Sequence, residues 1–264
     1  MGYRINGHKI AGYIFRAFVY IFLLLPLIVV ICTAFSDTPY VIFPAQGFTL
    51  RWFGAAMENQ QFIDSIFISL SIAIVSMIFS TLVGTMASLY FWKSQSRMKK
   101  ISELIFMSPV IVPTVIFAVA FLQFFATWGF LNAYWKLILA YSTIQIPYVI
   151  RCVSASLYGL DVSFEEASLV LGASPLRTLF KVILPCAKRG IIGGSIFSFV
   201  VAMDEAVIVM FLADARTITY PLRLYSYITE IYTPMVSAFS TLFIVISFII
   251  ILLVEKTIGL SKMY

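Results

Sequence analysis

Glu165-Glu166-Ala167-Ser168, followed by Gly172 and then by Val182-Ile183-Leu184-Pro185, forms a polar stretch between two long apolar runs. We call residues 161–185 the polar segment. A chain that is otherwise mostly apolar has little reason to keep a charged segment of this length unless another molecule docks on it. We therefore expect this segment to be exposed between two parts of the chain that cross a membrane.

The composition of the whole chain is that of a membrane protein. It has 264 residues, of which 61% are hydrophobic and only 11% are charged, whereas about 25% of the residues in a typical soluble domain are charged. The net charge is +6, but the basic residues are not gathered in one patch, so we expect no nucleic-acid partner. The composition indicates a polytopic protein of the lipid bilayer.

The sequence contains few groups that could serve catalysis or cofactor binding. His8 is the only histidine, which excludes a histidine-dependent nucleophile in the apolar body. The three cysteines lack metal-ligand spacing, and their odd number argues against a disulfide framework. No GxxxxGK[ST] loop is present, so the chain cannot hydrolyse ATP by that route. We expect a non-catalytic chain that binds no metal and no cofactor.

Six windows are apolar and long enough, at about 20 residues, to cross a bilayer as helices. The first could be the core of a signal peptide, but it is long for that purpose and no small-residue cleavage site follows it, which favours an uncleaved span. We expect an all-α fold with six transmembrane helices in a single domain, residues 1–264. The expected spans are residues 14–35, 63–92, 104–127, 134–156, 188–212 and 234–255.

The distribution of Lys and Arg predicts the orientation in the membrane. With both termini in the cytoplasm, 14 of the 18 basic residues lie on the cytoplasmic side, in agreement with the positive-inside rule. The polar segment is then cytoplasmic. The loop of residues 36–62 is external, with a turn and a short interfacial helix. Pro109 and Pro113 in the third span predict a kink or a delayed helix start there.

The polar segment is expected to form two short helices. Ser163 can cap the first, and Glu166 three residues later completes a capping box. Gly172 is typical of a left-handed helix stop, and Pro175 is typical of the first position of a new helix. We expect Pro185 to end that second helix.

The spacing within the polar segment resembles a known family signature. Glu166-Ala167-Ser168, three residues, Gly172, nine residues and Val182-Ile183-Leu184-Pro185 are similar to the EAA signature of bacterial ABC-importer permeases, which is E-A-A, three residues, G, nine residues and I-x-L-P. Ser168 replaces the last alanine and Val182 replaces the isoleucine, and both changes are small. The resemblance covers most of the chain.

The resemblance implies a permease subunit in the bacterial inner membrane with several partners. It implies that the polar segment is a coupling helix seated on a dimer of separate ATPase subunits, which hold ATP and Mg. A second homologous permease and a periplasmic or extracellular substrate-binding protein complete the importer. The residues implied in ATPase coupling are Glu165, Glu166, Ala167, Ser168, Gly172 and Pro185.

A second polar feature, Asp204-Glu205, lies in the apolar run of residues 191–212. A charge at membrane depth costs about 2.5–3.5 kcal/mol on insertion scales, so such groups usually face a bundle interior or a water-filled path. The pair could line a substrate path, pair structurally with a neighbouring subunit, or lie at the membrane surface. Adjacent helical positions are about 100° apart, and we favour Asp204 facing a path and Glu205 facing a partner.

The sequence around this pair, residues 199–207 with residues 220–225, also resembles the second permease subunit of spermidine/putrescine importers. That resemblance implies a small cationic or amine-bearing solute such as a polyamine. Carboxylates and aromatic faces attract cations, and aromatic residues make up 16% of the chain. Permeases for gamma-aminobutyrate, opines, phosphonates, thiamine and iron have similar sequences, so these solutes stay open as alternatives.

Two other classes of protein fit the sequence less well. An ion-coupled secondary transporter usually shows paired inverted repeats with broken helices. Gly84 and the two prolines of the third span offer only a weak match, without a convincing repeat. An intramembrane enzyme would need a reactive constellation, and the chain offers only Asp204 and Glu205.

Overall fold

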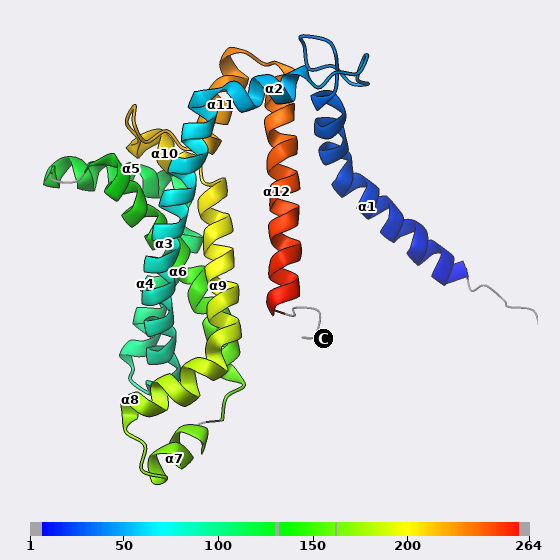
Figure 1. Ribbon diagram of the computed structural model, residues 1–264. Coiled ribbons are helices and arrows are strands. Elements are labelled where there is room, and N and C mark those ends of the chain that lie inside the picture. Colours follow the sequence, from blue (N-terminus) through cyan, green and yellow to red (C-terminus); the bar gives the residue numbers. More distant parts are fainter. Residues whose placement is uncertain (1–6, 130–131, 162, 259–264) are drawn as a thin grey trace, which may run out of the picture. The chain divides into compact units, whose positions relative to one another are not determined.

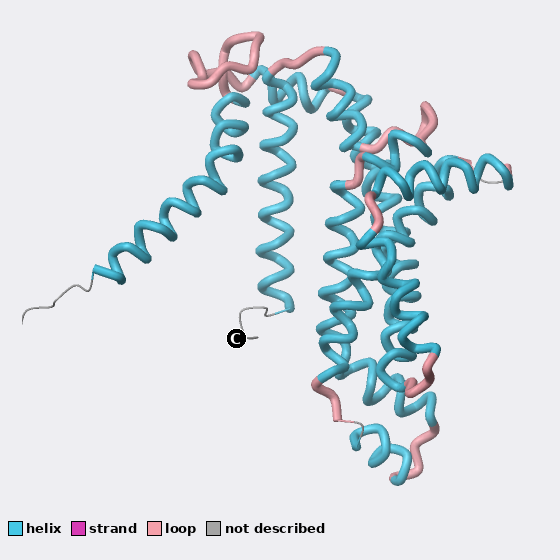
Figure 2. Tube along the Cα trace, turned by 180° about the vertical axis from the view of Figure 1, so that it is seen from behind, coloured by secondary structure: helices cyan, strands magenta, loops and turns pink. Residues whose placement is uncertain are grey.

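The described part of the chain is built of helices, which confirms the all-α class (Figures 1 and 2). The computed structural model describes residues 7–129, 132–161 and 163–258. The contacts divide the chain into two compact units, one of residues 62–223 and the other of the residues on either side. Each unit is described by itself, and the single domain expected for residues 1–264 stays a prediction.

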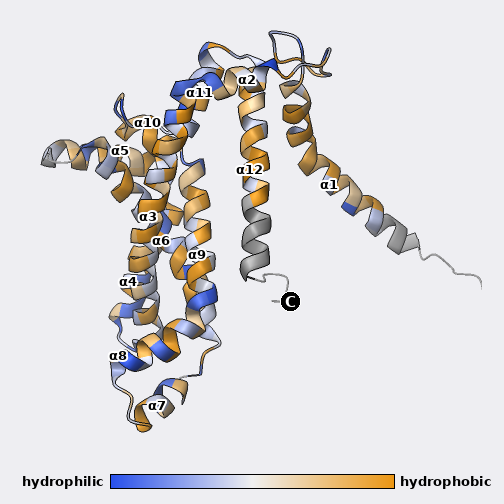
Figure 3. Ribbon diagram, viewed as in Figure 1, coloured by the Kyte–Doolittle hydropathy of each residue, from blue (hydrophilic) through white to orange (hydrophobic). Residues whose placement is uncertain are grey.

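The flanking unit is organised around two long apolar helices, α1 (Gly7–Ala34) and α12 (Pro234–Ile258). They pack together, and Thr33 Oγ1 donates a 3.0 Å hydrogen bond to Ser237 Oγ where both side chains are buried. Apolar side chains of α1 between Tyr13 and Ile28 are exposed, and this helix is coloured as hydrophobic over most of its described length (Figure 3). An apolar surface of this extent is typical of a helix that faces lipid.

Three long helices run side by side through the central unit (Figures 1 and 2). They are α3 (Gln60–Lys93), α6 (Ala133–Tyr158) and α9 (Leu184–Asp204). Glycines let the backbones approach: a Cβ on Gly190 of α9 would lie 2.4 Å from the carbonyl oxygen of Cys152 on α6. A Cβ on Gly84 of α3 would lie 2.7 Å from the Cβ of Val149 on α6. Small residues serve this purpose at interfaces of membrane helices, where lipid supplies no hydrophobic driving force.

A buried polar cluster also ties these three helices together. The amide nitrogen of Gln145 on α6 donates to Ser76 Oγ on α3 over 3.1 Å. The amide oxygen of Gln145 accepts hydrogen bonds from Ser80 of α3 at 3.1 Å and from Ser198 of α9 at 2.7 Å. Gln145 is fully buried. Its hydrogen bonds offset the desolvation of the amide, because an unpaired amide in an apolar interior would cost several kcal/mol.

Four helical stretches are long and apolar enough to cross a membrane by themselves: residues 12–34, 60–93, 133–158 and 175–204. The first three agree with the expected spans of residues 14–35, 63–92 and 134–156, and the fourth overlaps only part of the fifth expected span, residues 188–212. The short helix expected in the loop of residues 36–62 is α2 (Arg51–Glu58). The sixth expected span corresponds to α12, in which residues 234–249 form a shorter apolar helix.

The third expected span, residues 104–127, is two helices rather than one. α4 (Met98–Ile111) and α5 (Thr114–Trp128) are bent by 106° at a break. Val112 at the break has extended backbone angles, φ −83° and ψ 132°, because the residue before a proline is driven away from the helical region. The expected kink is confirmed at Pro113, whereas the helix continues through Pro109.

The fifth expected span, residues 188–212, is also interrupted, which the sequence did not predict. α9 ends at Asp204, and the six-residue α10 (Val207–Leu212) follows after a gap. Glu205 in the gap is extended, with φ −74° and ψ 110°. A loop then leads to α11 (Tyr220–Glu230).

Candidate functional site

The polar segment begins with α7 (Ser163–Val170), whose start differs from the expected capping box. Ser163 is the first residue of the helix, and its backbone N–H donates to Asp161 Oδ1 over 2.9 Å. Ser163 is thus not the cap, and Glu166 does not receive that N–H. The hydrogen bonds from Ser163 hold the pKa of the Asp161 carboxyl below its usual range. The capping box was wrong because the Asp161 carboxylate, two residues before Ser163, accepts the N–H that the Glu166 side chain would have accepted.

The end of α7 agrees with the prediction for Gly172. This glycine has φ +85°, a left-handed conformation that other residues rarely adopt. Its N–H donates to the carbonyl of Leu169 at 3.0 Å, and the N–H of Ala173 donates to the carbonyl of Ser168 at 3.1 Å. These two bonds form a Schellman motif, which satisfies the last carbonyls of α7.

The second helix of the polar segment begins as expected but does not stop at Pro185. Ser174 accepts a hydrogen bond from the N–H of Arg177, and Pro175 opens α8 (Pro175–Thr178). A π-helical turn, η1 (Leu179–Ile183), then joins α8 to α9. The N–H of Leu184 bonds the carbonyl of Leu179, five residues back, so the change in hydrogen-bond register lies next to the residue that lacks an N–H. π-Bulges are a known way for a helix to absorb such a defect.

The two glutamates of α7 have opposite environments. Glu165 is buried, with 8% of its surface exposed, and its carboxylate pairs with Lys93 Nζ at 2.5 Å. Glu166 and Ala167 are exposed. Ser168 Oγ lies 2.9 Å from Thr178 Oγ1, which joins α7 to the end of α8.

The polar segment also exposes large apolar side chains. Leu171 is 87% exposed, although it lies beside the glycine stop of α7. The other exposed apolar side chains of α7, α8 and η1 include Phe164, Val170, Leu176 and Phe180. Exposed apolar side chains rimmed by charges are typical of a surface that another protein covers.

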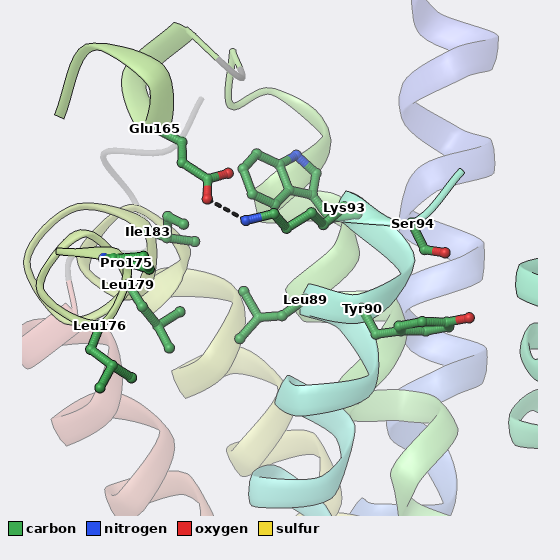
Figure 4. A pocket seen from close by; sticks show the side chains of 10 residues that line it. Leu89, Tyr90, Lys93, Ser94, Glu165, Pro175, Leu176, Leu179 and Ile183 are labelled. Atoms are coloured by element: carbon green, nitrogen blue, oxygen red, sulfur yellow. Dashed lines mark hydrogen bonds and ion pairs between the residues drawn. The ribbon is translucent and has the colours of Figure 1, made fainter. Parts of the chain in front are cut away.

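A pocket of about 530 Å³ lies between the end of α3 and the α7–η1 region (Figure 4). Lys93 and Glu165 point toward each other at one side of it, and Leu89 and Leu179 line its wall. The wall is mostly apolar, and Lys93 and Glu165 are the charged residues that line it.

Asp204 and Glu205 do not lie on one continuous helix, so the expected angle of about 100° between them does not apply. Asp204 is the exposed last residue of α9. Glu205 is partly buried, and its carboxylate accepts a 3.0 Å hydrogen bond from the N–H of Ile208 at the start of α10. Its backbone carbonyl accepts a 2.7 Å hydrogen bond from the hydroxyl of Tyr141 on α6. Glu205 is therefore bound within its own chain, whereas the side chain of Asp204 is exposed.

Asp204 continues an exposed stripe on α9. Phe197 and Val200 are 48% and 55% exposed, and Phe197 lies 5.0 Å from Tyr148 of α6, between ring centroids. Two helical turns, about 10 Å, separate Phe197 from Asp204 along α9. The stripe combines aromatic faces with one carboxylate, which is the chemistry that attracts an organic cation.

Lys93 and Tyr141 are functional candidates that the sequence alone did not reveal. In the sequence, Lys93 is one of the 14 basic residues that indicate the orientation, and no local pattern connects it with Glu165, 72 residues later. Tyr141 lies in an apolar helix without any motif. A basic residue in the last turn of a long helix was the only available signal for Lys93, since such residues favour the negative helix end.

Comparison with known families gives a match over most of the chain. Residues 80–258 match the family described as "Binding-protein-dependent transport system inner membrane component". This range contains the whole polar segment, both breaks and the acidic pair.

Curated relatives cover nearly the full length. The spermidine/putrescine transport system permease protein PotC of Escherichia coli K12 is 29% identical over 238 residues, which is 90% of both chains. PotC of Haemophilus influenzae Rd is 30% identical over 240 residues, covering 90% of this chain and 93% of that protein.

A solved structure has a similar fold. The bacterial alginate ABC transporter, in complex with an alginate pentasaccharide-bound periplasmic protein, contains a chain with a TM-score of 0.72. The two chains are 17% identical, and the match covers 95% of this chain and 94% of the other. At this identity the likeness concerns the fold.

Proposed function

Because this chain belongs to the family of binding-protein-dependent transport system inner membrane components, and is the non-catalytic permease subunit of an ABC importer, we propose that it forms half of a path for polyamines. The observation that carries the proposal is Asp204, an exposed carboxylate at the broken end of α9 and in line with Phe197. The names of the curated relatives, which are spermidine/putrescine permeases, support the same solute class.

The chain is a multi-pass membrane protein, and we extend this to six spans with both termini in the cytoplasm of a bacterial cell. Four long apolar helices, or five spans when the bent pair α4–α5 is counted as one, support this extension. We assign the sixth span to α12, whose residues 234–249 form a shorter apolar helix. The excess of Lys and Arg in alternate loops supports the orientation. The polar segment then lies on the cytoplasmic side, where ATP is available.

The polar segment is the docking site for a separate ATPase subunit, which binds ATP and Mg. Its exposed side chains support this role, because Glu166 and Ala167 lie on an open face of α7 and Leu171 extends from its end. Glu165 faces inward and pairs with Lys93, so its role in coupling is internal, and Pro185 shapes the helix start. A second homologous permease and an external binding protein complete the importer.

The break in α9 gives Asp204 a favourable setting for a cation. The carboxyl end of a helix carries a partial negative charge, so the end of α9 and the carboxylate of Asp204 act in the same direction. Broken helices whose ends face the substrate are a recurrent device of membrane transporters. An amine-bearing chain could place its ammonium group at Asp204 and its methylenes along Phe197 and Val200.

The proposal is tested with the importer reconstituted in liposomes with its ATPase, partner permease and binding protein. Asp204→Asn removes the charge but keeps the size of the side chain, and we expect spermidine uptake to fall about tenfold or more with unchanged assembly. Glu230→Gln, at the exposed end of α11, is the matched control. Uptake equal to that of the unmodified importer would exclude Asp204 from the path.

The same experiment separates the alternative solutes. Uptake is measured for spermidine, putrescine, gamma-aminobutyrate and thiamine, each with the ligand-loaded binding protein. A polyamine importer should lose transport of the dication and polycation in Asp204→Asn. If only a zwitterion or another solute is transported, the permease role stands and the solute assignment is wrong.

A further inference from the structure

Lys93 and Glu165 form an ion pair between two elements that are 72 residues apart in the chain. Lys93 is the last residue of α3, and Glu165 lies in the first turn of α7. A cation at the carboxyl end of a helix and an anion at the amino end both complement the helix dipole. Each partner is therefore favoured by its own helix as well as by the opposite charge.

The burial of the pair is unequal, and this sets the orientation of α7. The side chain of Glu165 is 9% exposed, whereas that of Lys93 is 67% exposed. A buried carboxylate without a partner is costly, so Lys93 allows Glu165 to stay turned inward. With Glu165 inward, the adjacent Glu166 and Ala167 face outward.

A second contact holds α7 from the other side. Ser168 and Thr178 are joined by a hydrogen bond of 2.9 Å between their hydroxyls, and Thr178 is buried at the end of α8. The helix that starts as α8 continues through η1 into α9. Consequently α7 is fastened to α3 at Glu165 and to the α9 helix at Ser168, two positions less than one turn apart.

Leu89 and Trp92 of α3 and Leu179 of η1 pack against one buried apolar cluster, and a pocket opens beside them next to Glu165. The pocket of about 530 Å³ separates the α7–α8 region from the end of α3, with Leu89 on one wall and Leu176 on the other (Figure 4). The apolar packing joins α3 to η1, whereas the Lys93–Glu165 pair joins α3 to α7 itself.

We propose that Lys93 and Glu165 are positioning residues of the coupling step, which transmit a displacement of α7 to α3 while Ser168 and Thr178 transmit it to α9. This inference rests on the proposed docking of an ATPase subunit on the polar segment. The two membrane helices then respond together to one event at α7. The pair itself need not touch ATP, the ATPase subunit or the solute.

The test is a charge exchange in the complete importer. Lys93→Glu and Glu165→Lys are compared with the double exchange, and uptake per ATP hydrolysed is measured in liposomes. Each single reversal should lower this ratio about tenfold, which is in the range of mutations that alter coupling between sites. The double exchange should recover most of the loss. Lys100→Glu and Glu103→Lys, on the exposed surface of α4, are matched charge controls that should keep the ratio.

The outcomes separate the proposal from its premise. Single reversals with a normal ratio, or a fully assembled double exchange that is no better than the single reversals, would overturn the link. If the reversals do not assemble, Glu165→Gln decides: it keeps a hydrogen-bonding group, and an unchanged ratio in it overturns the proposal. Docking is measured separately by cross-linking of Leu171→Cys to the ATPase subunit, with the parent chain as control. Absence of that cross-link contradicts the docking itself.

Discussion

The two ends of the helical run from Pro175 to Asp204 differ in a way that local sequence does not suggest. Near its start the run continues through Pro185, a residue that usually ends a helix. Near its other end it stops at Asp204 without a proline or glycine in the gap. The run therefore ends at Asp204, where groups outside the helix take up its hydrogen bonds. It continues through Pro185 because a shift of hydrogen-bond register precedes the missing N–H.

The hydrogen bonds at each end show how this works. At Pro185 the missing N–H coincides with the exit from the π-helical turn, where Leu184 bonds five residues back. At the break, Tyr141 donates to the carbonyl of Glu205, and the carboxylate of Glu205 receives the N–H of Ile208. The irregularity at Pro185 is accommodated by hydrogen bonds within the helix, whereas the break at Glu205 depends on a hydrogen bond from α6.

The largest expected effect comes from the glycine that holds the run against α6 between its two ends. Gly190→Ala places a Cβ 2.4 Å from the Cys152 carbonyl oxygen, and because backbone must move we expect a loss of about 2 kcal/mol in stability. The measurement is thermal unfolding of the purified importer in detergent. Gly193→Ala is the control, since its Cβ meets open space and alanine favours helix. Equal unfolding temperatures would contradict the close α6–α9 contact.

A smaller effect should follow from removing the cap at the break. Glu205→Ala takes away the acceptor for the Ile208 N–H, and loss of a helix cap costs about 1 kcal/mol. Glu205→Gln keeps an oxygen at that position and should preserve most of the stability. The unfolding temperature of the two variants is compared with that of Asp204→Asn, which should be unchanged while uptake falls. If Asp204→Asn is the less stable variant, the roles of the two acids have been assigned the wrong way round.

The smallest effect is expected at the other end of the run. Pro185→Ala supplies an N–H where the register has already changed, so we expect a change in stability below about 1 kcal/mol, well short of the penalty of about 3 kcal/mol for a proline in a regular helix. Hydrogen exchange of Leu184 and Cys186 in the two proteins would measure it. A gain near the full penalty would mean that Pro185 strains the helix, and the comparison between the two ends would fail.

Much of the fold and part of the candidate site were predictable because they depend on local patterns. The long apolar runs predict the membrane helices, since a bilayer demands about 20 apolar residues per crossing. Gly172 and Pro175 were predicted correctly because a left-handed turn and a first helical position select these residue types. The spacing from Glu166 to Pro185 was enough to indicate the family, which the match over residues 80–258 confirms.

The tertiary structure decided which polar groups meet. Lys93 selects Glu165 as the inward acid, and Tyr141 holds the broken end of α9. The competition at Ser163, where Asp161 takes the hydrogen bond expected for Glu166, is by contrast local. Tyr141 and Lys93 lie more than sixty residues from their partners in the chain. A sequence pattern describes only neighbours within a few helical turns. Which distant donor meets which acceptor is decided when distant segments fold against one another.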